Sequence, residues 1–167
     1  MVASHYGTLE GADAFHAARG NDAWVGASEV ARSAALIRAS SYIDGRYRDR
    51  FSGRKSGGRT QALEWPRLNA ADAIGEPIAD DEVPGEVVHA AYEAALIELG
   101  RPGFFSRAYT PSEQKVLTEV KGIRWTVVGG GTGKDGMRPV ATAVDGLLSG
   151  LLMPTPSASS SRFLLRA

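Results

Sequence analysis

Apolar residues recur at helical spacing in several parts of the chain, and this periodicity limits the fold more than any other feature. The strongest run follows Pro139, at positions i, i+3, i+4, i+7, i+8, i+11 and i+12 (Val140, Ala143, Val144, Leu147, Leu148, Leu151 and Leu152). A second run follows Pro84 and marks one face (Val88, Ala91, Tyr92, Ala95, Leu96 and Leu99). We therefore predict one helix from Pro139 to Leu152, ended by Pro154, and another from Pro84 to Gly100.

The first third of the chain predicts two more helices. Ser28 is a good N-cap, and the helix after it is expected to reach about Gly45 or slightly beyond. Its expected apolar stripe has i, i+4, i+7 spacing and is extended by larger residues (Val30, Ala34 and Ile37, then Leu36, Ile43 and Tyr47). A shorter helix, capped by Thr8, is expected to run through Arg19.

The segment between the helix capped by Ser28 and the helix that follows Pro84 lacks clear periodicity. Residues 52–60 (SGRKSGGRT) combine glycine, serine and basic residues, and predict a mobile loop. Residues 61–83 predict an ordered irregular connection, anchored by Trp65, Ile74 and Ile78. Long ordered connections of this kind are often contact surfaces.

A β-hairpin is predicted at about residues 115–128 (KVLTEVKGIRWTVV). Two β-prone runs with alternating side chains flank Lys121-Gly122, which would form the turn. An isolated hairpin is marginally stable, so it must pack on the helices or on another chain. The fold class expected is therefore mainly α: a small helical bundle with one β-hairpin and an extended C-terminal tail.

The chain divides into a helical domain, residues 1–153, and a flexible C-terminal docking tail, residues 154–167. The tail begins as a Pro/Ser linker and ends with an apolar cluster between basic residues (Arg162, Phe163, Leu164, Leu165 and Arg166). An apolar cluster on a flexible tether stays exposed to water unless it binds a partner, so we expect it to dock. The alternative is a frayed terminus.

Composition excludes several function classes. The 167 residues include no cysteine, which removes disulfides, thiolate zinc sites and cysteine nucleophiles. Lys+Arg and Asp+Glu both number 19, and this neutrality argues against a generic nucleic-acid coat. No apolar run reaches the ~18 residues of a membrane-spanning helix, and no signal peptide is visible, so we expect a cytosol-made protein without membrane contact.

The charges are nevertheless segregated along the chain. Residues 68–100 contain eight acidic residues and no lysine or arginine. The densest basic cluster lies just before them (Arg46, Arg48, Arg50, Arg54, Lys55 and Arg59). Complementary charge can steer self-association, so we predict a subunit interface between this cluster and the acidic residues Asp80, Asp81, Glu82 and Glu86. The alternative is two solvated faces whose charges cancel.

Motifs for catalysis, metals and cofactors fail on inspection. Residues 131–136 match G-x-G-x-x-G, but no later strand or acidic residue completes a dinucleotide site. The same stretch lacks the first glycine and the Ser/Thr of a phosphate loop. The three histidines have no metal-ligand spacing on one helix. We predict no catalytic, metal or cofactor residues; an enzyme with an unrecognised site has no motif behind it.

A second function remains open for the basic cluster. Tyr47 and Phe51 interleave with its arginines, and single-stranded nucleic acid is held by such alternation of cations and stacking aromatics. A single-stranded-DNA-binding module that uses the Arg46–Arg59 segment is therefore the alternative to a self-assembling protein.

Three segments carry a family resemblance over roughly residues 6–152. They are residues 39–47 (ASSYIDGRY), residues 61–67 (QALEWPR), and the Val83-Pro84 pair that opens an alanine-rich helix; the helix after Pro139 follows a Gly-rich stretch. In order and spacing they resemble the head–tail connector proteins of tailed bacteriophages, in particular the neck adaptor family. Similar sequences are also labelled DnaT-like single-stranded-DNA-binding.

The resemblance implies a structural virion protein without catalysis. It implies a ring, usually of twelve copies, between the portal protein and a stopper or tail-terminator component. DNA would pass through the channel without sequence-specific binding. The protein would be made in the host bacterial cytoplasm and reside in the virion neck, with its C-terminal segment reaching toward the portal.

Overall fold

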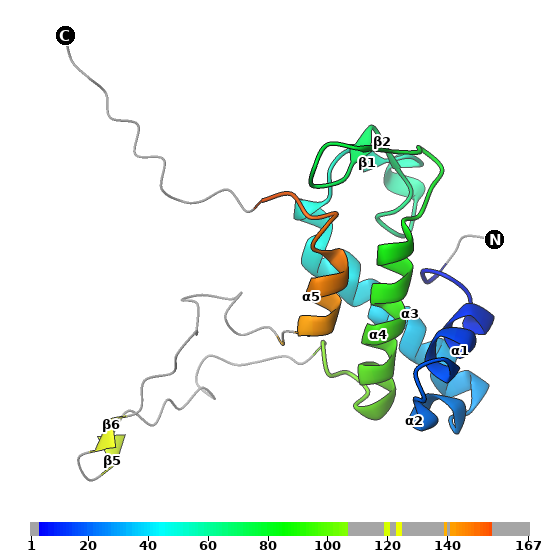
Figure 1. The fold of residues 1–167 in the computed structure, drawn as a ribbon, viewed down its shortest axis with the longest axis vertical. Coiled ribbons are helices and arrows are strands. Elements are labelled where there is room, and N and C mark those ends of the chain that lie inside the picture. Colours follow the sequence, from blue (N-terminus) through cyan, green and yellow to red (C-terminus); the bar gives the residue numbers. More distant parts are fainter. Residues whose placement is uncertain (1–3, 107–118, 121–122, 125–138, 140, 155–167) are drawn as a thin grey trace.

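The computed structural model describes residues 4–106, 119–120, 123–124, 139 and 141–154 (Figure 1). Within them lie helices α1 (Leu9–Ala17), α2 (Asp22–Val25), α3 (Glu29–Tyr47), α4 (Gly85–Gly100) and α5 (Thr142–Leu148), and 3-10 turns η1 (Arg48–Arg50) and η2 (Gly58–Thr60). The strands are two residues each: β1 (Arg54–Lys55), β2 (Arg67–Leu68), β3 (Ala70–Ala71), β4 (Pro77–Ile78), β5 (Glu119–Val120) and β6 (Ile123–Arg124). The predicted mainly α class is confirmed.

Helices α3 and α4 form the centre of the bundle. They pack on each other, α5 packs on α4, and α1 and α2 lie at the end of the bundle away from α5 (Figure 1). Six alanines on the two central helices are fully buried (Ala35, Ala39, Ala90, Ala91, Ala94 and Ala95). Small side chains at these positions let the helices approach closely.

The predicted N-caps Thr8 and Ser28 are confirmed, whereas the last helix begins at Thr142 and not directly after Pro139. The Thr8 side chain accepts a hydrogen bond from the Gly11 N–H at 2.9 Å, and Ser28 accepts one from the Ala31 N–H at 3.3 Å. Such caps satisfy backbone donors that have no partner inside the helix. Helix α1 ends at Ala17, two residues earlier than expected, and α2 was not predicted.

The predicted apolar face of α3 is confirmed for Leu36, Ile43 and Tyr47 and was wrong for Val30 and Ile37. Val30 is 80% exposed and Ile37 is 41% exposed, although both belong to the expected apolar stripe. The face that packs inward carries Leu36, Ile43 and Tyr47, each at most 1% exposed, together with small residues. Burying the larger side chains removes more apolar area from water, which explains the orientation of the helix.

The last helix is shorter than predicted. It ends at Leu148; Leu151 is buried in the turn that follows, and Leu152 is buried where the chain becomes extended. Leu152 forms an antiparallel bridge with Phe51, and the Met153 N–H donates to the Arg50 carbonyl at 2.8 Å. Backbone partners from the segment after η1 therefore replace those that further helical turns would have supplied.

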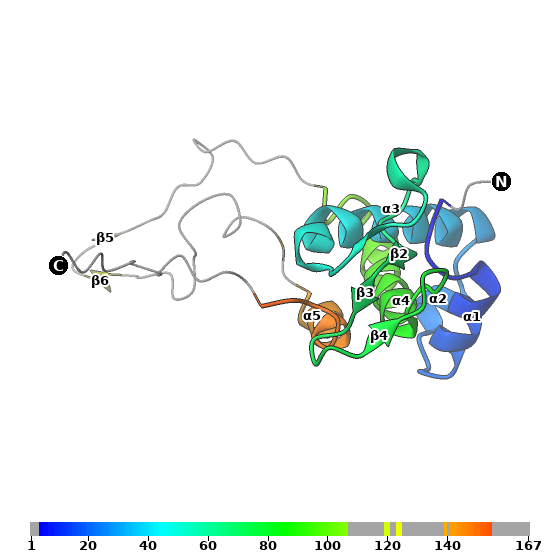
Figure 2. The same ribbon diagram turned by 90° about the horizontal axis from the view of Figure 1, so that it is seen from above.

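The region predicted as a mobile loop and an irregular connection contains two short antiparallel pairs. Strand β1 pairs with β2, and β3 pairs with β4 (Figure 2). Trp65 is buried and Ile78 packs against the core, as predicted. Ile74 is 86% exposed, so its predicted anchoring role was wrong; it lies in the connection between β3 and β4.

The predicted hairpin is confirmed where the structure describes it. Strands β5 and β6 are antiparallel, with Val120 opposite Ile123 across the expected turn. The rest of 115–128 lies outside the described residues, as do residues 155–167 and with them the predicted docking cluster. No helix in the described part of the chain is long and apolar enough to cross a membrane.

A buried glutamate fixes the chain after α4. Glu98 is fully buried and accepts from Arg38 Nε at 2.8 Å, from the Gly103 N–H at 2.8 Å and from the Phe105 N–H at 3.0 Å. The Phe105 ring stacks on Tyr42 with 3.7 Å between ring centroids. The exit from α4 is therefore held by both charge and packing.

A second buried carboxylate joins the N-terminal segment to α3. Asp44 is 6% exposed; it accepts from the Tyr6 hydroxyl through Oδ1 and from the Glu64 N–H through Oδ2 at 3.1 Å. The Tyr6 hydroxyl also accepts from the Glu64 N–H at 3.1 Å. Burial raises the pKa of Asp44 to about 6, because the charged carboxylate is desolvated.

This raised pKa predicts how stability depends on pH. The folded protein holds the Asp44 proton more tightly than the unfolded chain, where the pKa is about 3.9, so the contribution of Asp44 to stability increases as pH falls through 6. Between pH 7 and pH 5 the gain is about 1 kcal/mol. Urea unfolding of the wild type and Asp44→Asn at both pH values should show this gain in the wild type only; equal pH dependence in both would contradict it.

Candidate nucleic-acid interface

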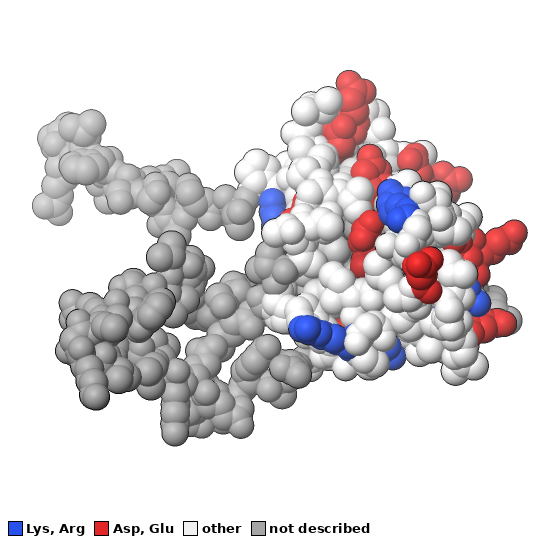
Figure 3. Space-filling view, turned by 60° about the horizontal axis from the view of Figure 1, so that its bottom comes forward, with Lys and Arg blue, Asp and Glu red and all other residues white. Residues whose placement is uncertain are grey.

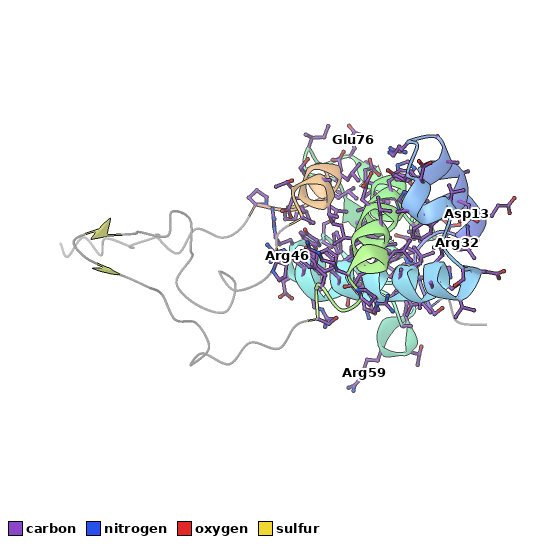
Figure 4. The ribbon with its side chains drawn as sticks, turned by 90° about the horizontal axis from the view of Figure 1, so that it is seen from below. Asp13, Arg32, Arg46, Arg59 and Glu76 are labelled. Atoms are coloured by element: carbon purple, nitrogen blue, oxygen red, sulfur yellow. The ribbon has the colours of Figure 1, made fainter. Side chains whose placement is uncertain are left out.

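A shallow, open hollow of about 500 Å³ lies at the tip formed by β1 and η2. It is lined by Arg54, Lys55, Gly58 and Arg59, and we call it the basic hollow. The Arg59 side chain extends away from the domain into solvent (Figure 4). With three cations around a concave surface, the basic hollow is suited to a phosphate-bearing ligand.

Gln61 holds the tip in shape. Its Oε1 accepts from the Gly57 N–H at 2.7 Å, and its Nε2 donates to the Leu63 and Pro66 carbonyls at 2.9 and 3.0 Å. Gly58 has φ of +59°, which most other residues adopt only with strain. The backbone beneath the cations is therefore ordered, and the predicted mobile loop was wrong because these hydrogen bonds of Gln61 were not foreseen.

Glu64 neutralises part of the predicted basic cluster. Its carboxylate lies 2.8 Å from Arg67, 3.3 Å from Lys55 and 3.9 Å from Arg48. Arg67 is itself buried and also donates to the Ser52 carbonyl at 2.7 Å. Neither Glu64 nor Arg67 was predicted as a site residue, because distance along the sequence does not reveal which charge is buried.

The remaining cations of the cluster separate in space. Arg50 donates to the Met153 carbonyl, and the Arg46 guanidinium lies 5.8 Å from the centroid of the Tyr47 ring. Arg46 and Arg59 lie in different parts of the domain (Figure 4). Four arginines of the cluster make no ion pair within the described part of the chain (Arg46, Arg50, Arg54 and Arg59). Of these, Arg54 and Arg59 are exposed and line the basic hollow, so they are the ones left for an external ligand.

The aromatic half of the DNA-binding prediction was wrong. Tyr47 is 1% exposed and its hydroxyl donates to Asp145, while Phe51 is 6% exposed and packs edge-to-face on Trp65. Both rings belong to the core, where their apolar area stabilises the fold. Neither can stack on a base, so any nucleic acid at the basic hollow must be held through its phosphates.

Acidic residues collect elsewhere on the domain. Asp80, Asp81, Glu82 and Glu86 are all exposed, and with Glu76 we call them the acidic edge. Figure 3 shows a surface on which acidic side chains are widely spread. Glu76 and Arg59 project from opposite sides of the domain (Figure 4). Glu76 is thus separated from Arg59, whereas Asp80 bonds to Asn69, which follows the strand paired with β1.

The acidic edge does not form a metal site. Asp80 Oδ1 accepts from the Asn69 N–H at 3.0 Å, across the β3–β4 segment. Among the residues that the structure describes, no three His, Asp or Glu side chains group so that they could hold a metal ion. The acidic residues near the start of α4 are instead favoured by the positive end of the helix dipole.

Removal of the Glu64 carboxylate should destabilise the tip. Glu64→Ala would leave the buried Arg67 without its ion-pair partner, at a cost of about 3 kcal/mol in the free energy of unfolding. Urea unfolding measures this, with Glu82→Ala as the exposed control, expected to change stability by less than about 0.5 kcal/mol. Equal effects of the two substitutions would refute a structural role for the Glu64 cluster.

Comparison with known proteins places the whole chain in one family. Residues 2–167 match the family model described as "Putative DnaT-like ssDNA binding protein". The chain belongs to this DnaT-like family. No curated protein and no solved structure matches the chain significantly.

Proposed function

We propose that the protein binds the sugar–phosphate backbone of single-stranded DNA at the basic hollow. The observation that carries this proposal is the exposure of Arg54 and Arg59, without ion-pair partners among the described residues, on an ordered concave tip. The match of nearly the whole chain to a family described as single-stranded-DNA-binding supports the same ligand.

The buried aromatics define the mode of binding. With Tyr47 and Phe51 in the core, affinity would come from phosphate contacts rather than from stacked bases. Such contacts release counterions, so binding would be sequence-independent and would weaken steeply with salt. Glu76 projects from the opposite side of the domain and would repel a strand there.

Charge reversal at the hollow tests this mode. In Arg54→Glu/Arg59→Glu, loss of two phosphate contacts should lower the slope of log K against log[salt] by about 1.4 for an oligothymidine. Affinity at ~50 mM salt should fall about tenfold or more. The matched control is Arg101→Glu, an exposed arginine just after the other end of α4. No binding by the wild type at ~50 mM salt would end the proposal.

A second candidate is a ring-forming adaptor between a phage portal and the next neck component. It is favoured by the opposed positions of Arg59 and Glu76, because a ring of identical subunits needs two different, complementary faces on each copy. The segments that resemble neck adaptors support the same role. In this candidate the basic hollow of one copy faces the acidic edge of the next.

Mixing two charge variants distinguishes the adaptor from a DNA-binding monomer. Arg54→Glu/Arg59→Glu should not assemble alone, and neither should Asp81→Lys/Glu82→Lys, because each presents like charges on both faces. An equimolar mixture should regain assembly, measured by native mass spectrometry with and without purified portal rings. If each charge variant alone assembled as the wild type does, the charge-matched contact would be contradicted.

A further inference from the structure

Three exposed apolar residues lie at the end of α2 and along the first half of α3. Val25 is 59% exposed, Val30 is 80% exposed and Ile37 is 41% exposed. Val25 ends α2, residues 26–28 connect the two helices, and Val30 and Ile37 are seven residues apart on one side of α3. We call these three residues the corner patch.

The corner patch is unusual for this domain. It holds three of the five large hydrophobic residues that are exposed in the described part of the chain. Two exposed acidic residues, Asp22 and Glu29, lie next to it in the same helices. Apolar surface with a charged rim is typical of a surface that receives another polypeptide segment.

The chain contains a segment with the complementary character. Its last residues include the apolar triplet Phe163-Leu164-Leu165, with Arg162 and Arg166 on either side. The apolar triplet matches the corner patch, and the two arginines match Asp22 and Glu29. A short segment of this kind can dock through a few apolar anchors while its charges set the register.

The length of the segment decides which copy it reaches. Met153 is bound to Arg50, beyond the C-terminal end of α3, whereas Val30 lies in the first turn of that helix. The 17 residues from Val30 to Tyr47 span ~26 Å along the axis of this helix. From Pro154 to Phe163 there are nine residues, which reach at most ~30 Å when fully extended. Docking on the same copy would need a nearly straight path around the domain.

We propose that residues 155–167 of one copy dock on the corner patch of a second copy. The contact buries Phe163, Leu164 and Leu165 against Val25, Val30 and Ile37, and pairs the flanking arginines with Asp22 and Glu29. It is independent of the basic hollow, so it holds whether or not the hollow binds DNA. It links copies head to tail, because the donor segment and the acceptor patch are different surfaces.

A peptide-binding measurement tests the acceptor patch. The receptor is the full chain carrying Phe163→Ser and Leu165→Ser, so that its own segment does not compete, and the probe is a fluorescent peptide of residues 155–167. We expect saturable binding, followed by fluorescence anisotropy. Adding Val30→Ser/Ile37→Ser to the receptor should weaken binding at least tenfold. Adding Ile74→Ser, at an exposed apolar position outside the patch, should leave it unchanged.

Two further measurements test the charge complementarity of the contact and the folding of the receptor variants. Glu29→Lys in the receptor should weaken peptide binding several-fold at low salt and less at high salt. Circular dichroism and thermal unfolding should be the same for all receptors, because the substituted side chains are exposed. The proposal would be overturned if the peptide did not bind saturably. It would also be overturned if the Val30→Ser/Ile37→Ser receptor bound the peptide as tightly as the Ile74→Ser receptor.

Sedimentation of the wild-type chain tests whether the acceptor is a second copy. Its average mass should rise with concentration around the dissociation constant measured with the peptide. This rise should vanish in Val30→Ser/Ile37→Ser and in Phe163→Ser/Leu165→Ser alike. A wild type that stays monomeric well above that concentration would refute docking between copies, even if the free peptide binds.

Discussion

The fold depends on two carboxylates held away from water. Asp44 accepts hydrogen bonds from Tyr6 and from the Glu64 backbone, and the Glu64 side chain in turn draws Arg67, Lys55 and Arg48 toward it. One connected network thus ties the N-terminal segment, α3 and the β1–β2 tip. Buried polar groups are costly when unpaired, so each member needs the others in place. The position of the basic hollow follows from this network.

The sequence predicted what local chemistry determines and missed what tertiary contacts decide. The caps at Thr8 and Ser28, the start of α4 after Pro84 and the pairing of β5 with β6 follow from residue type and neighbours. The buried face of α3 does not, because Val30 and Ile37 fit helical periodicity as well as Leu36 and Ile43 do. The early end of α5 depends on backbone partners about a hundred residues away in the chain.

The candidate site was predicted in the same uneven way. Arg54 and Arg59 were found because cations are dense there, and charge density is visible in the sequence. The buried state of Tyr47 and Phe51 and the neutralising role of Glu64 are not visible, since both depend on packing between segments. Of the six cations in the cluster, two exposed arginines and a half-buried lysine therefore remain together at one tip.

The anchoring of the chain after α4 affects how the segment between α4 and α5 can differ in length and sequence among members of this family. Glu98 and the Phe105–Tyr42 stack fix the chain on one side, and buried Ala141 fixes it where α5 begins. The two anchored points, after α4 and before α5, lie at the same end of the bundle, where α4 and α5 pack together (Figure 1). The bundle therefore places little demand on the intervening residues. Relatives could lengthen, shorten or exchange that insert to meet different neighbours while keeping the same scaffold.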